Sequence, residues 1–160
     1  MGEMDRIKIG GIIQNRHLAA IWILGIADRP GIAATVLDAL GRTHISAQFI
    51  AQLIDARRRD HICVCFDRAE LDQARPLVEV AALSVGAESV ELGDKVSLIS
   101  IFGPDFRDRP GIASCMFGAL AARGINILAI STSISTVSCL IEATRCDAAV
   151  EALQATFDLP

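Results

Sequence analysis

The hexapeptide Asp-Arg-Pro-Gly-Ile-Ala occurs twice in this chain, at 28–33 and again at 108–113. A chance repeat of six specified residues is very improbable in a chain of 160 residues, and duplication of a structural unit is its ordinary origin. The repeat therefore predicts two units of about 80 residues each. Because units of this size bury little surface alone, we expect them to pack together and the chain to form a homodimer.

Composition argues against two classes of partner. The net charge is −4, and the aromatic residues are limited to six Phe and one Trp, which disfavours nucleic-acid binding. The longest uncharged run, 124–141, is long enough to span a bilayer, but it holds Asn126 and six Ser or Thr residues. We therefore expect two strands there and no membrane segment.

The cysteines indicate a reducing compartment. The chain has five, with no CxxC pair, and no export signal is visible at its start, so we expect reduced thiols in the cytoplasm. His61, Cys63 and Cys65 would point to one face of a strand, which leaves a metal site open as an alternative. Burial as small apolar side chains is favoured, and we predict no metal and no cofactor.

Hydrophobic periodicity predicts the same order of elements in both copies. In the first copy Ile32, Val36 and Leu40 mark one face of a helix that follows a buried strand. The first copy predicts strand, helix, strand, strand, helix and strand at 17–26, 31–42, 45–54, 61–66, 68–83 and 87–92. The second predicts strand, helix, strand, strand and helix at 95–102, 111–124, 125–133, 136–143 and 146–157. Pro76 should kink or restart the helix that contains it.

The strand count predicts how the two units are connected. The second copy lacks a final strand, whereas the first has a surplus strand in front of it at 6–14. Because unpaired strand edges are a liability, we expect residues 7–14 to complete the sheet of the second unit. This predicts an α+β fold with one βαββαβ unit at 15–93, inserted into a second unit made of 7–14 plus 94–160.

The hexapeptide lies where a strand gives way to a helix. Capping is one interpretation, with Asp at the N-cap or in the preceding loop and Pro in the first helical turn. Capping does not require Gly31 or Gly111, however, and both remove a Cβ beside the helix N-terminus. The exposed N–H groups would then bind a carboxylate or phosphate, and Asp28 or Asp108 could accept an ammonium group. That combination favours a free α-amino acid as the ligand.

The segments 25–52 and 107–138 resemble the ACT domain, and more closely the tandem ACT regulatory region of aspartate kinase. The resemblance lies in D-x-P-G-I-A after a strand and G-I-N-I before the next one, and it implies ferredoxin-like units with one inserted into the other. It implies effector contacts at Asp28, Pro30, Gly31, Ile32, Ala33, Gln52, Asn126 and Ile127. The equivalent second-copy loop is Asp108, Pro110, Gly111, Ile112 and Ala113.

In that family the effector is lysine or threonine, and the restrained enzyme phosphorylates aspartate. This sequence departs from the family pattern at Ser46, where Asn is usual, at Gln48, where Asp is usual, and at Ile134-Ser-Thr, which replaces Glu-x-Lys. Changed polar groups around a small zwitterion alter which amino acid fits. The sequence therefore predicts amino-acid binding more firmly than it predicts lysine or threonine.

The sequence predicts no catalytic residues, because no nucleophile, base and orienting group stand at recognisable positions. We expect a regulatory protein that acts on a catalytic enzyme subunit. One alternative is the regulatory small subunit of acetolactate synthase, although that family has a single N-x-P-G-V-L type loop. Another is an acylphosphatase-like hydrolase, with Arg107 or Arg109 holding phosphate and Asn126 as its only candidate partner.

Overall fold

The computed structural model describes residues 6–104 and 106–160. The chain forms two compact units. Residues 17–96 form the first, named here the central unit, and residues up to 16 together with 97–160 form the terminal unit. Two long strands, β1 (Gly11–Ala27) and β4 (Ser89–Phe102), each contribute residues to both units.

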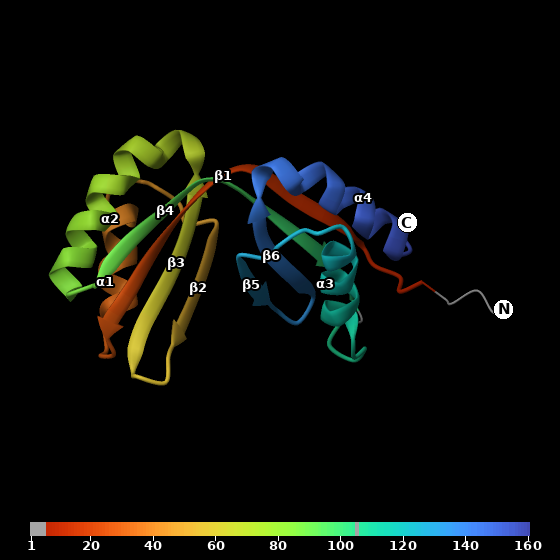
Figure 1. Cartoon of the computed structure of the whole chain (residues 1–160), viewed down its shortest axis with the longest axis horizontal. Helices are drawn as coiled ribbons and strands as arrows, with labels where there is room; N and C mark the ends of the chain where they lie inside the picture. Colours follow the sequence, from red (N-terminus) through yellow and green to blue (C-terminus); the bar gives the residue numbers. More distant parts are fainter. Residues whose placement is uncertain (1–5, 105) are drawn as a thin grey trace. The chain divides into compact units, whose positions relative to one another are not determined.

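The central unit has a βαββαβ order with both helices on the same side of the strands (Figure 1). Its strands lie in the order β2-β3-β1-β4. Besides β1 and β4, its elements are α1 (Ile32–Gly41), β2 (Phe49–Ile54), β3 (Arg59–Asp67), η1 (Arg68–Glu70) and α2 (Leu71–Val85). The alternating residues Ile62, Val64 and Phe66 of β3 are buried in one cluster with residues of both helices. The central unit is therefore an α+β structure of two layers, a sheet and the two helices that cover one of its faces.

The terminal unit has the strand order β1-β4-β6-β5. Its other elements are α3 (Ile112–Ala122), β5 (Ala129–Thr132), β6 (Thr136–Glu142), η2 (Ala143–Arg145) and α4 (Cys146–Thr156). The helix face Ile112, Met116 and Leu120 is buried, as the periodicity predicts. The described residues contain no helix with both the length and the apolar character needed to cross a membrane.

Two pairs of strands that the sequence predicts as separate are continuous. The predicted strands 6–14 and 17–26 join in β1, and 87–92 and 95–102 join in β4. No Gly or Pro interrupts β1 at the predicted break. In β4 the break was expected at Gly93-Asp94, but the chain stays extended there. Gly93 makes room for an indole ring, because a Cβ on it would lie 2.7 Å from Cζ3 of Trp22.

The helix predicted at 68–83 also differs from the prediction. It begins as the short turn η1 and continues as α2 from Leu71 to Val85, with Pro76 inside it. Pro76 removes one backbone donor and crowds the carbonyl four residues before it, but buried residues on both sides of it keep the helix continuous. The expected restart at Pro76 is therefore wrong.

The hairpin between β2 and β3 is organised around Asp55. Its Oδ1 accepts the backbone N–H groups of Arg57 at 2.8 Å and Arg59 at 2.9 Å, and its Oδ2 lies 3.1 Å from Nε2 of His61. These contacts, the N–H of Arg59 first and the ring of His61 second, hold the pKa of the Asp55 carboxyl below its ordinary value. The charged form of Asp55 therefore stabilises the turn that leads into β3.

We expect Gly93→Ala to lower the free energy of unfolding by about 1–3 kcal/mol, because the added methyl group overpacks the ring of Trp22. Gly118→Ala is the matched control, since a Cβ there meets no described atom within 4 Å. Alanine in the interior of α3 should raise the stability by about 0.5–1 kcal/mol. Urea unfolding followed by circular dichroism measures both. Equal effects of the two variants would contradict the packing at Gly93.

We expect Asp55→Asn to destabilise the protein at pH 7. The pKa of Asp55 is lowered in the folded state, so its contribution is complete above the unfolded pKa of about 4 and is lost as the pH falls through the folded pKa. The stability difference between wild type and variant should therefore shrink below about pH 4. Urea unfolding from pH 7 down to pH 3 tests this. Asp94→Asn, at an exposed position of β4, is the control for the loss of one negative charge. A difference that does not change with pH would count against the assignment.

Candidate functional site

Both helices that follow the hexapeptide begin at a glycine in the left-handed region. Gly31 precedes α1 with a φ of 94°, and Gly111 precedes α3 with a φ of 88°. Neither helix start receives a side-chain cap from the described residues. A Cβ built on either glycine would meet no described atom within 4 Å. The glycines themselves thus border open space, and the first-turn N–H groups have no side-chain cap among the described residues, at the end of the helix where the dipole favours an anion.

The structure corrects the predicted place of proline in this motif. Pro30 and Pro110 stand before the N-cap glycines and outside the helices, not in the first helical turn. The physical reason is that the left-handed glycine itself takes the N-cap position. Pro then restrains the turn that leads to it. The sequence analysis explains glycine at these positions only by the absence of a Cβ. The left-handed backbone conformation, which other residues rarely adopt, is a second reason why glycine stands there.

Asp28 is engaged by the β2–β3 hairpin. Its Oδ2 accepts from Nη2 of Arg58 at 2.7 Å, and its N–H donates to the carbonyl of Arg58 at 3.3 Å. The carboxylate that was expected to accept an ammonium group is therefore paired with a guanidinium group. Its second-copy counterpart Asp108 is exposed in the loop before α3.

Gln52 contacts a buried carboxylate that the sequence reasoning missed. Its Nε2 donates to Oδ2 of Asp60 at 2.6 Å, and Asp60 is only 1% exposed. The other oxygen, Oδ1, has no hydrogen-bond partner among the described residues. The sequence predicts a strand at 61–66, whereas β3 begins two residues earlier, at Arg59, and includes Asp60. Extending the alternation of Ile62 and Val64 back by one step would have placed Asp60 on the buried face.

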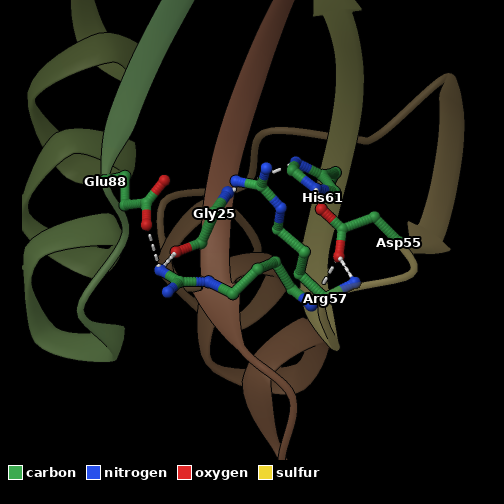
Figure 2. Close-up of polar contacts among 6 residues, drawn as sticks. Gly25, Asp55, Arg57, His61 and Glu88 are labelled. Carbon is green, nitrogen blue, oxygen red and sulfur yellow. Dashed lines mark hydrogen bonds and ion pairs between the residues drawn. The ribbon is translucent and has the colours of Figure 1, made fainter.

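A network around Gly25 fixes the end of β3 that carries Asp60 (Figure 2). Gly25 lies at a register shift in β1 and has a φ of 72°. Its N–H donates to Nδ1 of His61 at 3.3 Å, and its carbonyl accepts from Arg59. Arg59 also pairs with Glu88 at 2.6 Å. Gly25 and Arg59 therefore join β1, β3 and Glu88, the residue before β4, at this end of the unit.

Asn126 and Ile127 follow the C-terminal end of α3, whereas Gly111 stands at its N-terminal end. The eleven residues of α3 put about 16 Å of helix between them. Within the terminal unit Asn126 therefore lies apart from the loop 108–113, and the contact of Asn126 and Ile127 with an effector held by another unit, which the family resemblance implies, stays a prediction. Asn126 instead lines a hollow of about 270 Å³ with Gly124, Glu142 and Arg145.

The same separation removes the geometry of an acylphosphatase-like site. That alternative requires Asn126 beside Arg107 or Arg109, and these arginines precede α3 while Asn126 follows it. Within the terminal unit the helix keeps the two ends apart.

Cys63 and Cys65 are buried, at 5% and 0% exposure, as the favoured interpretation predicts. The hydrogen bond with Cys63, together with burial, raises the pKa of the Cys65 thiol, and burial raises that of Cys139 to about 12. Both thiols are therefore held in the protonated form, as buried small apolar side chains, which is a poor state for a nucleophile. The ring of His61 contacts Asp55 and Gly25 instead.

Comparison with known proteins agrees with this architecture. An ACT-domain family model matches residues 99–157. An aspartate kinase of Pseudomonas putida is 36% identical over 157 residues, which is 98% of this chain and 38% of that protein. The chain therefore spans well under half of the length of that relative.

Two solved structures are similar over nearly their whole length. A chain in the crystal structure of aspartokinase alpha and beta subunits has a TM-score of 0.83 and 30% identity, with 92% of this chain and 97% of that chain covered. The ligand-free regulatory subunit of aspartate kinase from Thermus thermophilus has a TM-score of 0.85 and 29% identity, with 94% and 99% covered. These similarities show that the chain belongs to the aspartate kinase family and contains an ACT domain.

Proposed function

We propose that this chain is a non-catalytic regulatory protein that binds a free amino acid and thereby controls a partner enzyme, such as an aspartate kinase. The observation that carries the proposal is the start of α1, where an N-cap glycine leaves backbone donors uncapped beside open space. The similarity to isolated regulatory subunits of aspartate kinase supports a regulatory role. It also favours aspartate kinase over acetolactate synthase as the model for the partner.

The ligand is a small amino acid of the lysine or threonine type. Its carboxylate binds the N–H groups of Ile32 and Ala33 at the positive end of α1, next to Pro30 and Gly31. The amide of Gln52, which both donates and accepts, supplies a further polar contact from β2. The loop from Asp108 to Ala113 has the same uncapped helix start and is a second candidate site.

We further infer that the two units are tandem ACT units, 15–93 and 7–14 plus 94–160, with the first inserted into the second. The grouping of residues up to 16 with 97–160 supports this division. The chain acts in a reducing compartment, the cytoplasm, because its five cysteines are all free thiols.

A homodimer is supported by the strand β2. In the described part of the chain β2 is the outer strand of the central unit, and it exposes Ile50, Leu53 and Ile54. An exposed apolar edge is a template for pairing with another copy of the chain. Ligand that binds the associated form better than the monomer would shift the population toward it, and the partner enzyme would respond to that shift.

Isothermal titration of the chain against the twenty amino acids tests the proposed function. We expect lysine or threonine to bind, and its α-carboxamide derivative to bind at least about tenfold more weakly, because the helix start has lost the charge it stabilises. Gly31→Ala should weaken binding, since alanine at a φ of 94° distorts the helix start. Gly118→Ala is the control that leaves the site intact. Absence of heat with every amino acid would overturn the proposal.

Sedimentation velocity tests the dimer. We expect the wild-type chain to associate in the micromolar range and a binding amino acid to increase the dimer fraction. Leu53→Lys should abolish association, because an exposed charge is placed on the apolar edge. Leu83→Lys, on an exposed position of α2, is the matched control. Equal association of the two variants would show that β2 is not the dimer edge.

A further inference from the structure

Asp60 is a buried acid with an unused acceptor. The residue is 1% exposed, one carboxylate oxygen is bound by Gln52 at 2.6 Å, and the other has no partner among the described residues. Buried polar atoms in native proteins are nearly always satisfied, so each exception requires an explanation. A buried carboxylate oxygen can bind a cation or accept a hydrogen bond from an ammonium group.

The strand register places Asp60 opposite Ile26, near the end of β1 that leads to α1. Asp60 pairs with Ile26 of β1, two residues before Asp28 and six before the first residue of α1. It lies on the same face of β3 as Ile62, and Ile26, Ile62 and Ile32 belong to one core cluster beneath the helices. The carboxylate therefore lies on the helix-covered face, at the end where β1 leads into α1.

Gln52 is the exposed residue that contacts this carboxylate. Gln52 is exposed, while the acid that it contacts is buried. Its pairing partner across the ladder is Ile62, so its side chain is on the helix-covered face as well. A ligand that meets the amide of Gln52 thus reaches the edge of the Asp60 site.

The terminal unit lacks this acid, although it repeats the hexapeptide. Phe49 pairs with Cys65 in the central unit, and Ala129 pairs with Leu140 in the terminal unit. Counting from these equivalent pairs, Ser135 stands where the central unit has Asp60. The same count places Thr132, which pairs with Val137, where the central unit has Gln52.

We propose that Asp60 receives the ammonium group of the amino-acid ligand, and that the central unit is therefore the site for a zwitterion. The inference rests on the proposed function and deepens it. It replaces Asp28 as the acceptor, because Asp28 is already paired with Arg58 at 2.7 Å. The carboxylate of the ligand lies at the N–H groups that follow Gly31, and its ammonium group donates to Oδ1 of Asp60. The terminal unit offers the anion subsite without the acid.

The test is isothermal titration of the full chain with L-lysine and L-threonine. Asp60→Asn keeps the shape of the side chain and removes its charge, and Asp60→Ser copies the terminal unit. We expect both variants to lose about 10–100-fold in affinity, the range of a hydrogen bond to a charged group. Ser135→Ala, the matched change in the other unit, should leave affinity unchanged. Urea unfolding establishes that each variant is folded under the titration conditions.

Ligand analogues separate an ammonium contact from a structural role of Asp60. 2,3-Dihydroxybutanoate lacks the ammonium group of threonine, 6-aminohexanoate lacks the α-ammonium group of lysine, and norleucine lacks its side-chain ammonium group. An analogue without the group that Asp60 binds should bind wild type weakly and lose nothing further with Asp60→Asn. The analogue that remains sensitive to Asp60→Asn identifies which ammonium group is bound.

Two failures are distinguishable. If wild type binds lysine or threonine and both Asp60 variants bind it equally well, the assignment of Asp60 is wrong and the proposed function stands. If all three analogues lose as much affinity as the parent amino acids on Asp60→Asn, Asp60 has only a structural role. If wild type binds neither amino acid, the proposed function fails for these ligands and this inference fails with it.

Discussion

The left-handed backbone at Gly31 and Gly111 is the constraint on which the rest of the structure depends. In each unit the chain leaves a strand, turns at a glycine whose left-handed conformation other residues rarely adopt, and enters a helix. Neither helix start has a side-chain cap among the described residues. Had Ser or Asp stood at this N-cap, its side chain would have occupied the first-turn donors. The glycine thus fixes the turn and leaves the donors unoccupied, so one residue joins the fold to the candidate site.

The two units share this turn, whereas the residues of the hairpins beside it differ. Both copies keep the helix start and the buried face that follows it, at Ile32, Val36 and Leu40 in the first copy. The hairpin that faces the start of α1 supplies Gln52 and Asp60, whereas Thr132 and Ser135 stand at the equivalent positions beside α3. Helix starts of this kind attract anions of many sorts. The residues outside the repeated motif therefore decide whether a zwitterion or a simple anion fits.

The sequence predicted the elements well where periodicity was strong and less well where a boundary depended on turn chemistry. The spacing of Ile112, Met116 and Leu120 predicted α3 because a helix buries every third or fourth residue. The continuity of β4 was missed, because the predicted strands stop on either side of Gly93, whose lack of a side chain accommodates Trp22 within an extended strand. The pairing of Asp28 with Arg58 was also missed. Contacts between residues distant in sequence leave no local pattern, so only the folded chain reveals them.

Asp60 illustrates how an energetic cost in the unliganded chain can serve regulation. An unsatisfied buried acceptor costs about 1–3 kcal/mol, and more when it is charged. An ammonium group that satisfies Oδ1 recovers that cost, so the ligand stabilises whichever conformation keeps Asp60 buried next to Gln52. A ligand shifts an equilibrium only by its difference in affinity between two states. Because the strand that carries Asp60 is also tied to Gly25 of β1 and to Glu88 through Arg59, a change in its position reaches β1 and the residue that leads into β4.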